Sequence, residues 1–400
     1  MLESAVDEVV RSHLERTFPA CAIYVIHRGQ PVLNRAWGWI DPEMRTLPAN
    51  TETLFDFASL TKLFTVTALL SLLSTHGLTV DTPLADVLPE FARTNPRSID
   101  GGQDPHSKQH LPTPPDKLGR QVDARAVTLR HVLTHTSGLP PWRDVYTAAG
   151  PPPVPPDEPE PVPRALRWSN GLAALVQYPF VASPDGIVRY SDIGLMLLGE
   201  AVARLHPSGD LETAIRVQVA DALQTGSICF NPVRSGRFER AQTAPTEVDP
   251  GWRKRRVWGE VHDENACGVG GVAGHAGLFG TAGALAKFGA RWLRDAEPFG
   301  VSSALRQAAI REQAVTGDTR RGLGFALKAA TDSMAGDRLS PRSFGHSGFT
   351  GTTLWIDPDA ELVIATLTNS VYSGRHSAAY ARTHEFRRTL HDAIAEACED

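Results

Sequence analysis

The sequence predicts an α+β fold in which strands from both chain ends build one antiparallel sheet, flanked by helices, beside an all-helical lobe. Three observations predict this fold. A helix and a hairpin come first, helical patterns fill the middle, and short strands with a closing helix come last. The 400 residues, of which 42% are hydrophobic and 21% charged, are enough to bury a large core in one enzyme-sized domain.

The N-terminal part of the chain predicts a helix, a hairpin and a buried helix. Residues 1–17 have amphipathic helical spacing, and the apolar runs 22–26 and 32–37 are separated by the turn-forming residues 27–30. Residues 60–73 are apolar on nearly every face, which is typical of a helix inside a protein.

The middle and the end of the chain predict further helices and then strands. Helical patterns cover residues 165–177, 191–205, 210–223 and 281–294. Short apolar runs bounded by Gly, Pro and Asp predict strands at 323–327, 343–346, 352–356 and 362–367, before a closing helix over 377–397. We therefore assign one domain, 1–400, with an α/β lobe of about 1–58 and 281–400 and a helical lobe of about 59–280.

Two insertions, at about 95–120 and 140–163, are rich in Pro, Gly and polar residues. Within the second, residues 151–156 predict extended, polyproline-like chain. Both insertions are expected on the surface. They are interpreted either as solvated loops or as flaps that shape a substrate cleft.

Composition excludes several classes of function. The formal net charge of −5, with both signs spread along the chain, gives no basic surface for nucleic acid or an anionic membrane. Residues 1–11 carry acids at helical spacing where a signal peptide has a basic start and an apolar run. No stretch approaches the roughly 18 apolar residues of a membrane span. We therefore expect a soluble, cytoplasmic protein, and the widely spaced cysteines are expected to be reduced thiols: Cys21, Cys229, Cys267 and Cys398.

A serine and a lysine mark the start of the predicted buried helix. Ser59 stands there, and Lys62 follows three residues later, which places both side chains on one helical face. A serine hydroxyl is a weak nucleophile until a base takes its proton. A lysine serves as that base only when burial or positive potential lowers its pKa. The pair alone is a weak motif.

Two further triplets accompany this pair. The three elements are Ser59-Leu60-Thr61-Lys62, Tyr190-Ser191-Asp192 and His346-Ser347-Gly348. They resemble the SxxK, YxN and K/H-[ST]-G motifs of the penicillin-recognising serine hydrolases, the β-lactamase-related family of class C β-lactamases, DD-peptidases and esterases. The connecting segments 133–139, 261–266, 271–279 and 348–352 resemble the same family. The likeness extends from about residue 20 to the C-terminus.

This resemblance implies a β-lactamase/transpeptidase-like fold, catalysis without a cofactor or metal, and a role for each motif residue. Ser59 is the implied nucleophile, and Lys62 and Tyr190 are the implied proton-transfer groups. The implied substrate-binding and oxyanion residues are Asp192, His346, Ser347, Gly348 and Phe349. The backbone amides of Ser59 and Phe349 would form the oxyanion hole, and Gly348 would let substrate lie close to its strand.

Two departures from the family pattern affect the expected chemistry. His346 stands where efficient β-lactamases carry lysine, which favours a DD-peptidase or esterase. Asp192 replaces the asparagine of many relatives, and a carboxylate near Lys62 would raise the pKa of the amine and shift the base role toward Tyr190. Alternatively, Asp192 points away from the cleft and accepts backbone amides at the start of the helix 191–205.

Other signals have competing interpretations. Residues 268–273 match a dinucleotide-binding fingerprint only superficially, because no βαβ unit surrounds them. Ser347 is a weaker candidate nucleophile than Ser59, because the elbow motif around it lacks its last glycine. The pairs His106/His110 and His131/His135 have HxxxH spacing without the glutamate of HExxH, so we expect no metal site. The aromatic residues in or near the loops either line a pocket or cap the core: Trp142, Tyr146, Trp252 and Trp258.

The sequence therefore predicts an enzyme that cleaves a small-molecule ester or amide through a Ser59 acyl-enzyme. An esterase or D-amino-acid-type peptidase is favoured. The alternatives are β-lactamase activity, or a catalytically silent protein that binds an acyl ligand or peptidoglycan fragment. The sequence does not specify an oligomeric state.

Overall fold

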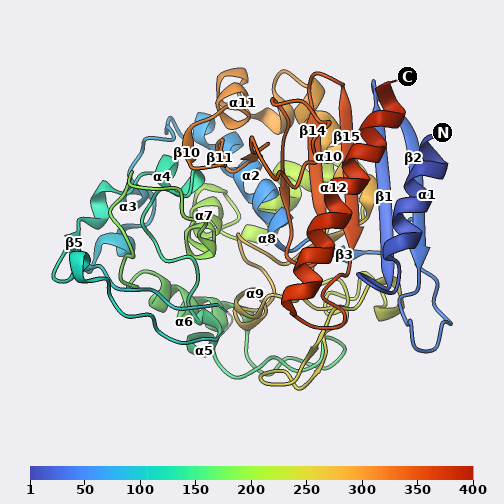
Figure 1. The fold of residues 1–400 in the computed structure, drawn as a ribbon. Helices are drawn as coiled ribbons and strands as arrows, with labels where there is room; N and C mark the ends of the chain where they lie inside the picture. Colours follow the sequence, from blue (N-terminus) through green and yellow to red (C-terminus); the bar gives the residue numbers. More distant parts are fainter. Residues whose placement is uncertain (106, 400) are drawn as a thin grey trace.

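The computed structural model describes residues 1–105 and 107–399, and its centre is an eight-stranded antiparallel sheet (Figure 1). The strand order is β10-β11-β12-β13-β14-β15-β1-β2. The strands are β1 Ala20–His27, β2 Gln30–Gly38, β10 Ala314–Thr316, β11 Thr319–Arg321, β12 Ala326–Leu327, β13 Phe344–Ser347, β14 Thr353–Asp357 and β15 Leu362–Thr368. β1 from the N-terminal part pairs with β15 from the C-terminal part, so the predicted sheet built from both chain ends is confirmed.

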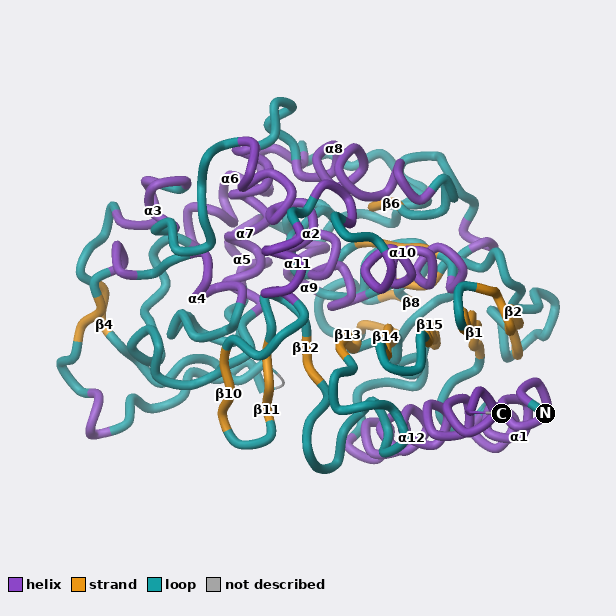
Figure 2. Tube along the Cα trace, turned by 90° about the horizontal axis from the view of Figure 1, so that it is seen from above, coloured by secondary structure: helices purple, strands orange, loops and turns teal. Residues whose placement is uncertain are grey.

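Helices cover both faces of this sheet (Figures 1 and 2). The helices α1, Leu2–His13, and α12, Ser377–Glu399, pack together on one face, and α10, Ala282–Arg294, packs on the other. Because side chains alternate along a strand, Ile23 and Val25 of β1 join the core under α1 and α12, whereas Ala22 joins the larger core on the opposite side.

The second lobe is helical and lies on the side of the sheet away from β2 (Figure 1). Its helices are α2 Thr61–Thr75, α3 Leu84–Val87, α4 Leu129–Leu133, α5 Val145–Ala149, α6 Arg164–Leu175, α7 Asp192–Leu205, α8 Leu211–Ile215 and α9 Glu264–Gly268, with α11 Ser303–Ala309 nearer the sheet. The predicted buried helix is confirmed, because α2 is enclosed along nearly its whole length and packs on α7. By length and composition alone, residues 58–75 would be able to cross a membrane, contrary to the expectation from the sequence, but 83% of that segment is buried in the protein.

Several predicted elements are shorter than expected. The predicted strand 323–327 is reduced to β12, because Gly324 has φ 81° and the space for a Cβ there is filled by Val66. The predicted helix 210–223 breaks after α8 into a π turn and a 3₁₀ turn.

The remaining short strands are β3 Phe55–Asp56, β4 Arg97–Ser98, β5 Gln121–Val122, β6 Cys229–Phe230, β7 Val248–Asp249, β8 Arg255–Arg256 and β9 Leu278–Gly280. All four cysteines are buried free thiols.

Candidate active site

The fold places Ser59 in a 3₁₀ turn, Ala58–Leu60, that leads directly into α2. This turn begins with a strained residue, because Ala58 has φ 47°, a conformation that non-glycine residues seldom adopt. The buried carboxylate of Asp56 holds the turn by accepting the Ala58 amide at 2.8 Å. Ser59 is thereby presented at the junction between the sheet and the helical lobe.

Lys62 is buried one helical turn after Ser59 and is surrounded by oxygen atoms. Its Nζ lies 2.8 Å from Ser59 Oγ, 2.7 Å from Asp192 Oδ1 and 3.0 Å from the His275 carbonyl oxygen. Burial by itself lowers the pKa of Lys62, but Asp192 and then Tyr190 outweigh it, so that the pKa is raised above its usual value. Lys62 is therefore an ammonium ion at neutral pH and is not the general base in that state.

Asp192 faces Lys62 rather than capping α7. It is the first residue of the helix, and the hydroxyl of Ser191 is the cap that accepts the Gly194 amide at 3.0 Å. The alternative in which Asp192 points away to accept backbone amides is therefore wrong. The physical reason is that serine caps a helix well, which leaves the carboxylate free to balance a buried charge.

Tyr190 contacts the same serine from the other side. Its hydroxyl lies 2.8 Å from Ser59 Oγ, and the Lys62 Nζ and Arg321 Cζ atoms lie 4.9 and 5.4 Å from the ring centre. Burial raises the pKa of Tyr190, and the charge of Lys62 opposes this rise only in part. Of the two partners of the Ser59 hydroxyl, the ammonium can only donate a hydrogen bond. Tyr190 is thus the partner able to receive the Ser59 proton, once it has lost its own.

Two histidines surround Tyr190 in neutral form. His135 packs on the ring at 4.7 Å between ring centres, and its Nδ1 accepts the Ser191 amide at 3.1 Å. His346 lies 5.9 Å from the ring and bonds the Ser347 carbonyl through Nδ1. Burial first, and then the charge of Arg321, lowers the pKa of each histidine well below its usual value.

β13 and the turn after it form one wall of the site. Ser347, whose hydroxyl makes no hydrogen bond within the described residues, has no partner that would activate it as a nucleophile. At Gly348 the space for a Cβ is filled by Thr352 Oγ1 and the Phe57 carbonyl, so internal packing alone requires glycine there. The Phe349 amide donates to no acceptor in the described chain and remains available to a substrate oxygen.

The site opens into two cavities that share Ser59, Tyr190 and Phe349. We call the first, of about 220 Å³, the α9 cavity; it is also lined by Lys108, Trp142, Asp192, Asp263, Glu264 and Arg375. We call the second, of about 560 Å³, the α12 cavity; its charged and ionisable lining consists of Arg321, His346, Tyr380, His384 and Arg387 besides Tyr190. No carboxylate lines the α12 cavity within the described residues. The two cavities therefore differ in their electrostatic character.

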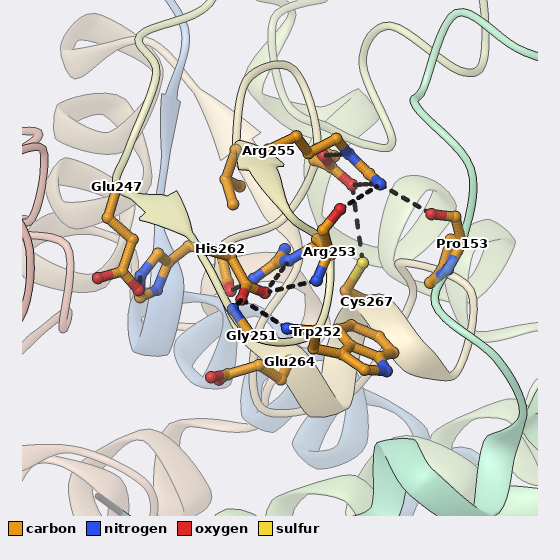
Figure 3. Close-up of polar contacts among 12 residues, drawn as sticks. Pro153, Glu247, Gly251, Trp252, Arg253, Arg255, His262, Glu264 and Cys267 are labelled. Atoms are coloured by element: carbon orange, nitrogen blue, oxygen red, sulfur yellow. Dashed lines mark hydrogen bonds and ion pairs between the residues drawn. The ribbon is translucent and has the colours of Figure 1, made fainter.

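A buried arginine organises the loop behind the α9 cavity (Figure 3). Arg253 donates to Asp249 at 3.0 Å and to the Val261 and His262 carbonyls at 2.7 and 2.6 Å. The neighbouring Arg255 donates to the Pro153 carbonyl at 2.9 Å. The second Pro-rich insertion is therefore anchored to the same loop that presents residues 262–264 to the cavity.

The described histidines of the two HxxxH pairs have other partners. His131 bonds Asp185 through Nε2 at 2.8 Å, and His135 bonds the Ser191 amide. His110 lies 3.2 Å from Arg143 Nη1, whereas His106 lies outside the described residues. No group of three or more His, Cys, Asp or Glu side chains in residues 1–105 and 107–399 is arranged to hold a metal ion.

Sequence reasoning missed three contributors to the site. Arg321 lies in a three-residue strand too short to give a recognisable pattern. His275 presents its carbonyl to Lys62, while its Nε2 bonds Asp263 at 2.8 Å. Asp263 and His275 lie in the segments 261–266 and 271–279 that carry the family resemblance, so this resemblance was the sequence signal that could have identified them.

We expect Asp192→Asn to move the acidic limb of the kcat/KM profile to lower pH. The carboxylate opposes proton loss from both Lys62 and Tyr190, so without it both groups deprotonate at lower pH. Kinetic measurement of the pH profile checks this. A profile identical to that of the wild type would mean that Asp192 does not act on the proton-transfer pair.

The same substitution has a stability signature. Because the pKa of Lys62 is raised on folding, the interaction stabilises the folded state fully below about pH 10.4, the ordinary pKa of lysine, and is lost as the pH rises through the raised pKa. The Tm of Asp192→Asn is therefore expected to lie below that of the wild type at neutral pH. The difference should shrink in alkali.

Comparisons with known proteins identify the family of the chain. A family model described as Beta-lactamase matches residues 6–386. A putative D-alanyl-D-alanine carboxypeptidase of Escherichia coli (strain K12) is 26% identical over 396 residues, which cover 92% of this chain and 82% of the relative. An N-acetylmuramyl-L-alanine amidase of Bacillus subtilis (strain 168) is 29% identical over 391 residues, which cover 92% of this chain and 81% of that protein.

Solved structures share the fold along the whole chain. EstCE1, a hydrolase with promiscuous acyltransferase activity, superposes with a TM-score of 0.70 at 18% identity and covers 98% of each chain. The D-amino acid amidase from Ochrobactrum anthropi SV3 superposes with a TM-score of 0.67 at 17% identity and covers 99% of each chain. These structures support the predicted fold class.

Proposed function

Because the chain belongs to the β-lactamase family of hydrolases, we propose that it cleaves an ester or amide through an acyl-enzyme formed on Ser59. The observation that carries this proposal is the position of Ser59 Oγ, which lies 2.8 Å from both Lys62 Nζ and the Tyr190 hydroxyl. A nucleophile between a cation and a proton acceptor is the arrangement that acyl transfer requires.

The reactive state is the one in which Lys62 and Tyr190 together have lost one proton. Asp192 keeps Lys62 as an ammonium ion, so the lost proton comes from Tyr190. The Tyr190 phenolate then receives the Ser59 proton as Oγ bonds to the substrate carbonyl carbon. The carbonyl oxygen takes the electron pair and accepts hydrogen bonds from the amides of Ser59 and Phe349. As the electron pair returns and the bond from the carbonyl carbon to the leaving group breaks, Tyr190 gives the proton to the leaving group. Water then attacks the acyl carbon while Tyr190 takes its proton, and Tyr190 returns that proton to Ser59 Oγ as the bond between Oγ and the acyl carbon breaks.

The α12 cavity supports a leaving group with a carboxylate. Tyr190, which must give the leaving group its proton, lines both cavities, but only the α12 cavity has no carboxylate in its described lining. Arg321 lines this cavity, and its buried Nε and Nη1 have no hydrogen-bond partner in the described chain, so the guanidinium charge is left to attract a carboxylate. Within the proposed function, this favours a D-amino-acid-type peptidase over an esterase for neutral esters. The relatives named as a carboxypeptidase and a D-amino acid amidase support the same choice.

A substrate pair tests this assignment. We expect Arg321→Met to lower kcat/KM for an N-acyl-D-alanyl-D-alanine by about 10- to 100-fold, the effect of losing a hydrogen-bonded charge pair. The corresponding C-terminal amide should lose much less. Arg320→Met is the matched control, because Arg320 pairs with Glu312 at the surface. Equal losses for the acid and the amide would refute a carboxylate-binding role.

A catalytically silent binding protein is the weaker alternative. The buried ammonium of Lys62 directed at Ser59 costs desolvation free energy, and a protein that only binds ligand has no use for it. Stoichiometric penicillin binding without any ester or peptide turnover would favour that alternative.

A further inference from the structure

A lysine from the insertion 95–120 lies within the α9 cavity. Nζ of Lys108 is 4.1 Å from the centre of the Trp142 ring, 5.8 Å from that of Tyr146 and 3.5 Å from Glu264 Oε1. Proteins bind organic cations with this combination of aromatic faces, and a nearby carboxylate adds charge attraction. The chain therefore places one of its own ammonium groups in a ready-made cation site.

The aromatic and acidic parts of this site are fixed without help from Lys108. The fully buried side chain of Asn265 donates to the Arg143 carbonyl at 2.8 Å and accepts the Tyr146 amide at 3.0 Å. These two bonds hold the backbone at Arg143, which follows Trp142, and at Tyr146, and Asn265 is adjacent to Glu264 in α9. Arg375 holds Glu264 from the other side at 2.9 Å. The site formed by Trp142, Tyr146 and Glu264, which we call the cage, is therefore preorganised, and this lowers the free-energy cost of binding a ligand.

Lys108 is the replaceable part of the arrangement. Its side chain is 32% exposed, whereas that of Glu264 is 14% exposed and Trp142 is 5% exposed as a residue. A long unbranched lysine can leave the cage by rotating its own side chain, and its ammonium is readily rehydrated. Once Lys108 has left, the Glu264 carboxylate that lines the cavity keeps only Arg375 as an ion-pair partner among the described residues, so it attracts a second cation.

We propose that Trp142, Tyr146 and Glu264 form a subsite for an ammonium group on the acyl part of the substrate, which displaces Lys108 on binding. The acyl part is meant because the α12 cavity is assigned above to the leaving group, and the α9 cavity is the other cavity that Ser59 lines. This assignment to substrate rests on the proposed function. The ligand class is an acyl chain that ends in a primary or quaternary ammonium group.

Calorimetry tests the subsite without requiring catalysis. Wild type, Lys108→Met and Lys108→Arg are each titrated with choline chloride and with 3,3-dimethylbutan-1-ol, the neutral analogue in which a tert-butyl group replaces the trimethylammonium group. Lys108→Met should bind the cation about tenfold more tightly than the wild type, in the range of a cation–π contact. Lys108→Arg, which keeps a cation in the cage, should resemble the wild type. An equal gain for the neutral analogue, or no gain for the cation, would overturn the proposal.

Kinetics connect the subsite to the reaction. p-Nitrophenyl esters with a trimethylammonio-acyl group and with the isosteric tert-butyl-acyl group are compared in the same three proteins. The ratio of kcat/KM for the cationic to the neutral ester should rise about tenfold in Lys108→Met and stay unchanged in Lys108→Arg. A ratio unaffected by Lys108→Met, despite tighter cation binding in calorimetry, would refute its role in substrate selection. Failure of the acyl-enzyme proposal would instead appear as ester hydrolysis that persists in Ser59→Ala.

Discussion

Ser59→Ala is expected to lower kcat/KM for ester or peptide hydrolysis by about 10⁴-fold or more, the range seen when the nucleophile of a serine hydrolase is removed. The substitution deletes the only hydroxyl that contacts both Lys62 and Tyr190 among the described residues. What remains is the activity of a site that binds and polarises substrate without forming the acyl-enzyme. Steady-state kinetics on purified protein measure this loss directly.

Folding controls separate this chemical effect from damage to the protein. Ser59 lies in the turn before α2, and its side chain makes no core packing that alanine would remove. The Tm of Ser59→Ala should therefore equal or exceed that of the wild type, because active sites are often locally strained. A Tm close to the wild-type value combined with retained hydrolysis would show that another residue is the nucleophile.

Tyr190→Phe is expected to lower kcat by about 10²- to 10⁴-fold with little change in KM, which is the effect of removing a proton-transfer group. The change deletes one oxygen atom and leaves the ring between Lys62, Arg321 and His135. The residual activity should also lose the acidic limb that belongs to the Lys62 and Tyr190 pair. Tyr178→Phe is the matched control, because Tyr178 is a half-buried tyrosine that lines neither cavity of the site.

The proton-transfer role of Tyr190 also predicts how kcat/KM of the wild type depends on pH. Burial raises the pKa of Tyr190, and Asp192 helps to hold a proton on Lys62, so the pair loses its proton only above neutral pH. We expect kcat/KM to rise with pH through the neutral range. If Tyr190→Phe kept nearly full activity, the Ser59 proton would have to pass through Lys62 or water instead.

Much of this site was predictable from the sequence because the spacing of motif residues along the chain determines some of their contacts. The three-residue interval between Ser59 and Lys62 is a local property of one helix, and it predicts their contact without knowledge of the fold. The contact of Tyr190 with Ser59 is long-range, and it became predictable only through the family resemblance. The sheet was predictable for a similar reason, since β1 and β15 both show recognisable apolar runs.

Other features depend on tertiary context that no local pattern encodes. Whether Asp192 caps α7 or faces Lys62 depends on whether Ser191 caps that helix instead. The triplet Tyr190-Ser191-Asp192 is compatible with either arrangement. Arg321 acquires its position next to Tyr190 only when a three-residue strand joins the sheet between β10 and β12. The position of Lys108 over Trp142 joins the first Pro-rich insertion to the second, and neither segment has periodicity that predicts the pairing.

The most direct test of the central claim is identification of the acylated residue. The protein is incubated with a fluorescent penicillin or a fluorophosphonate, digested, and the modified peptide is located by mass spectrometry. The account predicts one labelled residue, Ser59, with labelling that is lost in Ser59→Ala and retained in Ser347→Ala. A label that maps to Ser347, or that persists in Ser59→Ala, would contradict the assignment of Ser59 as the nucleophile.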